Sequence, residues 1–420
     1  MEFIFILLIF GYLALAFKNL KLSVALIPLL LPLYLVRFQV LGVPFTLLEG
    51  FTYAVAIPVF IDIVKNYKTF KYNWTYGLLD LLFLACIIGV VIVPKETLLI
   101  DGSTIYEGQR VSLGMLKGFI FAPMLYFVSF LRVLKEKEWK EYALKGYILG
   151  ASILALWGIY QAITGDYITV DFRASGPFES ANYLALYVGP AFVAVFIYFW
   201  KTLKRCGKET EMIASGILMA ILFMAIIFTR SYGALIGSFA GILFYALYSV
   251  SKVWKIASVV IVGFVFAISF FIHAGSDKFE KFLDFENRSS SSVRIEVWEI
   301  AVGLIREHPI LGIGLGQYEP QYQLKAPQIL GHPPYEWVML HPHNLYLAFW
   351  LNTGLLGMAA FLFLIVIGLR NFMLASREKK RFLIIGAAML IAILVHGFFD
   401  VPFWKNDLAY IFWLTLGLLL

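Results

Sequence analysis

Long apolar stretches separated by short polar connections dominate this chain of 420 residues. A transmembrane helix needs roughly 20 predominantly apolar residues, and fewer where it lies in a protein interior. By this criterion we expect 12 or 13 transmembrane helices, because several stretches are short. The stretches lie at about 2–17, 22–36, 45–64, 75–93, 112–131, 142–164, 180–200, 211–229, 231–250, 253–273, 343–369, 382–397 and 406–420.

One long polar segment, residues 274–342, interrupts this pattern. The serine run at 289–292 favours the start of a helix and Pro309 its end, so we expect a helix over about 291–307. Its two apolar stripes indicate that it lies on the membrane bundle or in the membrane interface. The chain therefore divides into an N-terminal transmembrane bundle at 1–273, a loop with helices at 274–342 and C-terminal transmembrane helices at 343–420.

The amino-acid composition also indicates a membrane protein. Apolar residues make up 61% of the chain and charged residues 15%, whereas soluble domains have about 45–50% and about 25%. These values exclude a soluble enzyme, a disordered chain and a nucleic-acid-binding domain, and they predict an all-α polytopic membrane protein. Cys86 lies in an apolar stretch and Cys206 in a basic loop, so we expect no disulfide and no cysteine metal site.

The basic residues orient the predicted helices. Of 34 Lys and Arg, 21 fall in six short connections on one side of the membrane and 13 on the other. Six of those 13 lie in the segment 274–342, and long translocated segments report poorly on topology. Because Lys and Arg accumulate in cytoplasmic loops, we expect the side with 21 to be cytoplasmic. Most of the basic residues then face the headgroups of membrane lipids, and they do not indicate binding to nucleic acid.

The kind of basic residue differs between the two sides. Inside, 16 of the 21 are Lys, whereas outside seven of the 13 are Arg. Arg presents a planar fork of donors suited to phosphate or carboxylate, and Lys acts as a point charge. We therefore expect the outward face to bind an anionic, phosphorylated ligand. The outward arginines are Arg37, Arg110, Arg173, Arg230, Arg288, Arg294 and Arg306.

Two of these arginines stand at predicted helix ends. Arg173 precedes a turn at 176–177, and either Ser180 or Asn182 can cap the helix that follows. The segment is either an ordinary entry into a helix or an anion site at the helix N-terminus. Arg230 stands in a minimal break between two apolar stretches. A charge there is costly unless it is paired, reaches the interface or faces an aqueous cavity, and we favour a ligand-facing charge.

The helix expected over 291–307 carries Arg294 in its first turn, where the helix dipole favours an anion. The glycine-rich segment 312–316 follows it. This segment does not follow a strand, so we exclude a dinucleotide-binding fold. A tight turn and a phosphate-binding backbone loop both stay open as interpretations.

A pair of histidines, His341 and His343, opens the stretch at 343–369, and Asn344 follows directly. Imidazole can act as a general base or a metal ligand near neutral pH. The spacing is not typical of a zinc site, and no Cys or HExxH motif supports one, so we expect no metal. Capping of the next helix is the structural alternative. Asp400, expected on the same side, is a candidate to orient a histidine.

Six short motifs follow one another along these segments. They are Arg173-x-x-Gly176-x-Phe178-x-x-x-Asn182, Thr229-Arg230-Ser231-x-Gly233-Ala234, Arg294-x-x-x-Trp298, His308-Pro309-x-x-Gly312-x-Gly314, His343-Asn344-x-Tyr346-Leu347 and Gly354-Leu355-Leu356-Gly357. In this order they resemble the O-antigen ligase family, which also contains O-antigen polymerases and bacterial O-linked oligosaccharyltransferases. The resemblance covers residues of about 170–360.

The resemblance implies a GT-C-like membrane glycosyltransferase with a large, partly helical periplasmic loop ahead of its last three spans. It implies a multi-pass protein of the bacterial inner membrane with a periplasmic active site. The donor is then a glycan on undecaprenyl diphosphate and the acceptor is lipid A–core. The family uses no nucleotide sugar, no cofactor and no divalent metal.

Roles transfer from the family motif by motif. Arg230 and Arg294 correspond to arginines associated with the donor diphosphate, and we place Arg173 with them. His343 corresponds to the loop histidine of the family, and we favour it over His341 as general base because it directly precedes the Asn of the motif. The residues expected to support the site are His341, Asn344, Asn182 and Asp400.

The expected function is therefore that of an inverting, metal-independent O-antigen ligase of lipopolysaccharide biosynthesis. An O-antigen polymerase or a protein O-oligosaccharyltransferase with the same donor is the near alternative, because nothing in the sequence fixes the acceptor. A lipid-linked glycan flippase or a secondary transporter is the alternative of another class. It predicts functional charge at mid-membrane, whereas the unusual charges here gather outside.

Overall fold

The computed structural model describes residues 2–40, 42–69, 72–95, 98–100, 104–203, 207–249 and 289–420, together with residues 263 and 267. Within these ranges the chain is almost entirely helical, and the predicted class of all-α polytopic membrane protein is confirmed. Among the described residues, eight helices are long and apolar enough to cross a membrane, and four apolar helices are shorter. The span predicted at 253–273 and Arg288 lie outside the described residues.

The described elements follow the predicted apolar stretches closely. They are α1 (Glu2–Lys18), α2 (Leu20–Leu26), η1 (Ile27–Leu35), β1 (Arg37–Val40), β2 (Val43–Thr46), α3 (Leu47–Lys65), η2 (Tyr67–Thr69), α4 (Trp74–Val91), β3 (Leu98–Ile100), β4 (Thr104–Tyr106), α5 (Gly108–Met115), η3 (Leu116–Phe121), α6 (Ala122–Val133), α7 (Lys137–Thr164), α8 (Ala181–Leu203), α9 (Glu209–Thr229), α10 (Tyr232–Ser249), α13 (Ser290–Glu307), α14 (Tyr318–Leu330), α15 (Leu345–Leu374), α16 (Arg377–His396) and α17 (Asn406–Leu419).

Two of the predicted spans are composites of shorter helices. The span predicted at 22–36 is the α-helix α2 followed by the 3₁₀ helix η1, which contains Pro28 and Pro32. Proline lacks an N–H and clashes with the preceding turn, so a regular α-helix does not continue through this segment. The span predicted at 112–131 joins α5 to α6 through the π-helical segment η3.

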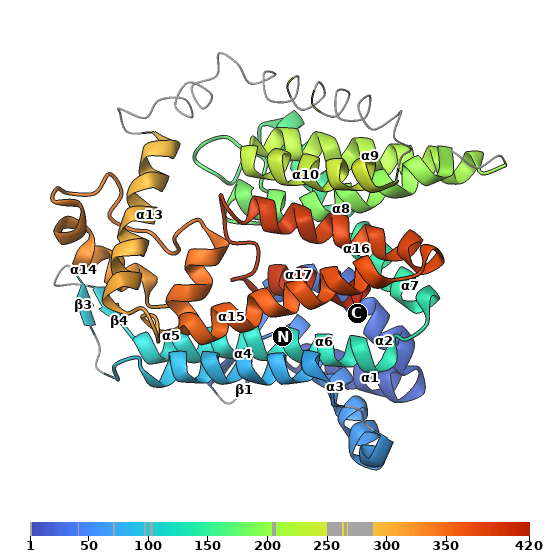
Figure 1. Cartoon of the computed structure of the whole chain (residues 1–420), viewed down its shortest axis with the longest axis horizontal. Helices are drawn as coiled ribbons and strands as arrows, with labels where there is room; N and C mark the ends of the chain where they lie inside the picture. The colour runs from blue at the N-terminus through green and yellow to red at the C-terminus, as the bar shows by residue number, and fades with distance from the viewer. Residues whose placement is uncertain are drawn as a thin grey trace.

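Figure 1 shows most helices running along the long axis of the molecule, with α13 and α14 at one end, together with the β3–β4 hairpin. Helix α10 packs on α16, α8 on α9, α15 on α4, and α17 on α6. The first described helix of the polar segment, α13, begins at a capping box formed by Ser289 and Ser292. The helix predicted over 291–307 is thus present.

Three glycines allow α10 to approach α16 closely. A β-carbon added at Gly237 would lie 2.6 Å from the carbonyl oxygen of Ala392, and one at Gly241 would lie 2.5 Å from that of Ala388. One at Gly233 would meet the ring of His396 at 2.8 Å. The spacing of four residues keeps these glycines on one face of α10, and small residues at that spacing allow close packing of membrane helices.

Helix α15 is broken at Gly354, which the sequence pattern did not predict. This glycine has φ 63° and ψ −170°, a conformation open essentially to glycine alone. The glycine-rich segment lies against the break: the N–H of Ile313 donates to the carbonyl of Leu351, and that of Gly316 to the side chain of Asn352. The N–H of Leu315 donates to the carbonyl of Gly89 in α4. The segment is therefore a tight structural turn, because these donors are used within the protein.

We expect Gly354→Ala to lower the free energy of unfolding by at least about 1–3 kcal/mol, the cost of holding a non-glycine residue in this backbone conformation. The added β-carbon would also overlap the carbonyl oxygen of Ile310. Chemical denaturation of the detergent-solubilised protein measures the change. Gly11→Ala in α1 is the matched control, since a β-carbon there meets nothing within 4 Å. If Gly354→Ala and Gly11→Ala lowered the free energy of unfolding equally, the break in α15 would not require glycine.

Candidate functional site

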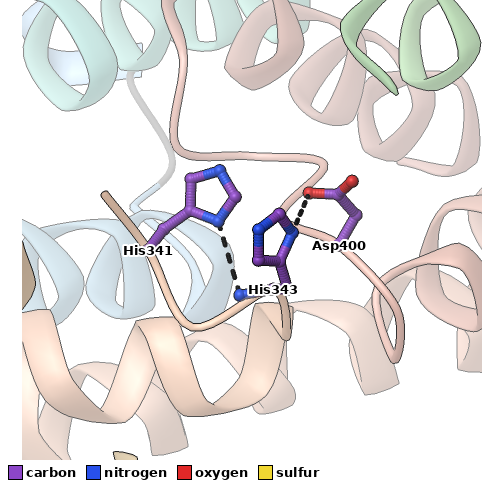
Figure 2. A group of neighbouring side chains, drawn as sticks. All are labelled: His341, His343 and Asp400. Carbon is purple, nitrogen blue, oxygen red and sulfur yellow. Dashed lines mark hydrogen bonds and ion pairs between the residues drawn. The ribbon is translucent and has the colours of Figure 1, made fainter. Parts of the chain in front are cut away.

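Loops and helix ends distant in the sequence meet around Asp400. This residue lies in the connection between α16 and α17 and is 3% exposed. His343, just before α15, places its Nδ1 3.5 Å from the carboxylate oxygen Oδ1 of Asp400 (Figure 2). The rings of His341 and His343 are 4.4 Å apart, and the backbone N–H of His343 donates to Nδ1 of His341 at 3.4 Å. The structure thus joins both predicted histidines and Asp400 in one cluster.

The electrostatics of this cluster favour a charged carboxylate at Asp400 and a neutral ring at His341. Burial opposes ionisation of Asp400, but contact with His343 and the proximity of the other histidines hold the pKa of Asp400 well below its usual range. Burial, together with the neighbouring His343, lowers the pKa of His341 to about 3, although Asp400 opposes the shift. Asp400 is therefore an anion and His341 a neutral ring at neutral pH.

Arg294 reaches the same place from α13. Its Nε is buried and has no hydrogen-bond partner among the described residues, and its Nη1 reaches the carbonyl of Ser290 at 3.5 Å. Burial lowers the pKa of the Arg294 guanidinium, and the charge of Asp400 opposes that shift. A buried cation with unused donors is costly unless an anion completes it.

A small cavity of about 20 Å³ lies between these groups. It is bordered by α8, α10, α13 and the segment that ends α16. Its lining residues are Asn182, Ser231, Tyr232, Gly233, Ile236, Ser290, Arg294, His396, Phe399 and Asp400. The structure therefore brings Asn182, Arg294 and Asp400, three of the residues selected from the sequence, to one cavity wall.

Arg173 is used inside the protein. It is 8% exposed, and its Nε donates to the carbonyl of Thr229 at 2.6 Å. Its Nη1 donates to Asp171 at 3.1 Å and its Nη2 to the side chain of Asn182 at 2.8 Å. These bonds tie the loop before α8 to the break between α9 and α10. Arg173 thus holds the residue that precedes Arg230.

Arg230 and His343 share an unusual backbone conformation. Their φ angles are 49° and 46°, in the left-handed region that non-glycine residues rarely adopt. Arg230 ends α9, and its N–H donates to the carbonyl of Ile227. Such strain persists only where surrounding contacts fix it, and it concentrates at functional sites.

The asparagines selected from the sequence are positioning groups. The side chain of Asn344 caps α15 by accepting from the N–H groups of Tyr346 and Leu347, and it donates to the carbonyl of Phe398. Capping by Asn344, the structural alternative, is therefore present. At α8 the hydroxyl of Ser180 accepts from the N–H of Asn182, which leaves the Asn182 side chain to hold Arg173.

His396 is a site residue that the sequence analysis missed. It is buried at the end of α16, lines the small cavity and packs against Gly233. Its signal in the sequence is a histidine that closes an apolar stretch, four residues before Asp400. A histidine at the end of a membrane helix has the same sequence pattern whether it faces the lipid headgroups or a cavity. Only the packing of α10 against α16 shows that His396 faces the cavity.

A larger cleft of about 390 Å³ lies next to His341. Its walls come from η1, β1, α5, η3, α14, α15 and the loops before α8 and α17. It is lined by Tyr34, Leu35, Arg37, Val111, Met115, Phe119, Pro177, Phe178, Glu179, Tyr183, Gly316, Tyr318, Glu319, Leu340, His341, Pro342, Ala348, Asn352, Trp404, Lys405 and Asn406. His341 therefore borders the cleft, while Asp400 borders the small cavity.

The cluster of His341, His343 and Asp400 also has the composition of a metal site. One ligand atom from each residue lies within 4.8 Å of the others. Two imidazoles and a carboxylate suit a transition metal. The same three groups suit a general base held by a carboxylate. The geometry therefore allows both kinds of chemistry.

The sequence was compared with protein families and with known proteins. Residues 217–362 match the family model described as O-antigen ligase, so the resemblance seen in the motifs is confirmed over this segment. A Rickettsia conorii protein with the provisional name polysaccharide ligase is 29% identical over 146 residues, which make up 34% of this chain and 33% of that protein. The match thus spans a third of that relative. Arg230, Arg294 and His343 lie inside the matched segment, whereas Arg173 and Asp400 lie outside it.

We expect Arg173→Gln to lower the free energy of unfolding by about 1–3 kcal/mol, the cost of leaving the buried carbonyl of Thr229 without its hydrogen-bond donor. The change leaves Asp171 and the carbonyl of Thr229 without their cation. Thermal unfolding in detergent measures it. Arg110→Gln is the control: the Arg110 side chain is 73% exposed, so the change should be within about 0.5 kcal/mol. If Arg173→Gln left the stability unchanged, Arg173 would not be what ties the loop before α8 to the break between α9 and α10.

Proposed function

We propose that this protein is a membrane glycosyltransferase of the O-antigen ligase type. Its donor is a glycan on undecaprenyl diphosphate, and its acceptor is a sugar hydroxyl of lipid A–core. The observation that best supports this is the half-buried Arg294, whose buried Nε has no partner among the described residues, beside the His343–Asp400 pair. Arg294 and His343 lie in the segment that matches the family.

The proposed reaction is a single displacement at the anomeric carbon. The oxygen of the acceptor hydroxyl forms a bond to that carbon, and the bond from the carbon to the diphosphate oxygen breaks. The electron pair leaves with the undecaprenyl diphosphate, and the hydroxyl proton passes to His343. One displacement inverts the anomeric centre. Asp400 stabilises the resulting imidazolium, because its buried carboxylate lies 3.5 Å from Nδ1 of His343.

The arginines neutralise the charge of the diphosphate leaving group. A diphosphate leaving group needs neutralisation of its charge, and guanidinium groups supply it through charge-assisted hydrogen bonds. Arg294 and Arg230 take this role. The cavity of about 20 Å³ beside Arg294 holds little more than a water molecule, so the diphosphate binds at its mouth. Arg173, placed with these residues from the sequence, acts by fixing the break that carries Arg230.

The proposed place of the enzyme is the bacterial inner membrane, with the site facing the periplasm. The apolar helices support a membrane location. The periplasmic side rests on the uneven distribution of Lys and Arg. A flippase or transporter is less well supported, because the His–Asp pair and Arg294 gather where helices begin or end.

Expression in a ligase-deficient Gram-negative strain with a matching O-antigen and core tests the proposal. We expect recovery of long-chain lipopolysaccharide, visible on a gel. His343→Ala and Arg294→Ala should lower transfer by about 10²–10⁴-fold and about 10²–10³-fold, the contributions of a general base and of one charge-stabilising donor.

His332→Ala and Arg306→Ala are the matched controls, since both side chains are exposed, and they should retain activity. All variants must reach the membrane at equal levels. Full activity of both site variants would refute the assignment. Lengthened lipid-linked glycan without transfer to core would instead identify a polymerase.

Removal of metal separates the two chemistries that His341, His343 and Asp400 allow. We expect transfer by the purified protein to continue in excess chelator, because the reaction needs a base and cations that the protein itself supplies. The rate is compared before and after dialysis against chelator. A loss of activity that zinc or another divalent ion restores would show that the cluster holds a metal.

A further inference from the structure

The cleft beside His341 differs in character from the cavity beside Arg294. It is about 390 Å³ in volume, within the size range of small-molecule sites. Both aromatic rings and charged side chains line its walls. This combination suits a sugar, since the C–H faces of a sugar ring pack on aromatic rings while its hydroxyls need hydrogen-bonding partners.

Its aromatic wall is held in place by a buried cation. Nζ of Lys405 lies 4.2 Å from the ring centre of Tyr34, 4.4 Å from that of Phe178 and 4.8 Å from that of Tyr183. The same Nζ is 2.7 Å from the carboxylate of Asp407, whose side chain is fully buried. Cation–π contacts of this kind fix ring orientation. The aromatic wall is therefore preorganised in the absence of a ligand.

Three polar groups at the cleft have no hydrogen-bond or ion-pair partner among the described residues. The indole N–H of Trp404 is buried without an acceptor. Arg37, exposed on β1, and Glu319, half-buried on α14, both line the cleft, and their side chains make no hydrogen bond or ion pair in the described part of the chain. Burial raises the pKa of the Glu319 carboxyl. Two donors and one acceptor are thus available to a ligand.

The position of the cleft relative to the histidines indicates which sugar it takes. In a displacement with inversion, the nucleophile and the leaving group lie on opposite sides of the anomeric carbon. Arg294 and Asp400 border the small cavity, and His341 borders the cleft. His343 lies between them, in contact with both His341 and Asp400. A hydroxyl in the cleft therefore approaches His343 by way of His341, whereas a diphosphate at the Arg294 cavity lies toward Asp400.

We propose that this cleft binds the acceptor saccharide, with Glu319 and Arg37 selecting it through its hydroxyls and polar substituents and Trp404 donating to it. The inference rests on the proposed function and adds the acceptor site to it. The π-helical segment η3, which contributes Phe119 to the cleft, agrees with this assignment, because π-helical turns often mark functional sites.

Kinetics of the purified full-length protein test the assignment, with undecaprenyl diphosphate-linked glycan as donor and lipid A–core as acceptor. Glu319→Gln and Arg37→Gln should each raise the KM for lipid A–core by about 10–100-fold, the loss of one charge-assisted hydrogen bond. The KM for the donor and kcat should stay within about twofold. Glu299→Gln and Arg306→Gln are matched controls, since both residues are exposed on α13 and line neither cavity.

Two results would overturn the assignment: an unchanged acceptor KM in both cleft variants, or a rise confined to the donor KM, which would place the donor glycan in the cleft. Calorimetric titration with delipidated core oligosaccharide separates this proposal from the proposed function. Wild-type protein and the Glu299→Gln/Arg306→Gln double variant should bind it, and the Glu319→Gln/Arg37→Gln double variant should bind at least tenfold more weakly. If that pattern holds while no transfer occurs, the reaction assignment fails and the cleft assignment stands. Retained binding of undecaprenyl diphosphate shows that the cleft variants are folded.

Discussion

The buried carboxylate of Asp400 is the charge around which this end of the molecule is organised. An isolated carboxylate in an apolar bundle is expensive, so a fold that buries one must surround it with cations or donors. Here His343 lies at 3.5 Å, the N–H of Val401 donates to the same oxygen, and Arg294 lies within electrostatic reach. His343, Asp400 and Arg294 are thus parts of one charge balance. Alteration of any of them changes the solvation of the others.

The backbone that presents these charges is fixed by contacts well outside the cluster. Arg173 ties the loop before α8 to the carbonyl of Thr229, which sets the position of Arg230. The glycines of α10 let α16 approach until His396 meets Gly233. The tight turn after α13 is bonded to the broken part of α15 through Ile313 and Leu351. The precision of the site therefore comes from the packing of its supporting elements.

The sequence predicts the helices well because membrane insertion imposes a long apolar stretch on each one. It also selects Arg294 and the two histidines that the fold brings near Asp400, since an Arg or a His at a membrane boundary stands out against an apolar background. It does not predict the break at Gly354, because a glycine within an apolar stretch has the same pattern whether the helix continues or not. Nor does it predict that Arg173 is already hydrogen-bonded, or that His396 faces the cavity. Both depend on contacts between residues more than 50 positions apart, such as that of Arg173 with Thr229.

The left-handed backbone at Arg230 and His343 bears on how the protein tolerates change. Each residue holds a conformation that costs an ordinary side chain about 1–2 kcal/mol and costs glycine almost nothing. Replacement of either residue by glycine would therefore relieve this backbone strain while removing the side chain. Under the proposed function, both positions then hold a trade-off between stability and activity, because the glycine that relaxes the backbone also removes the group proposed to act on the substrate.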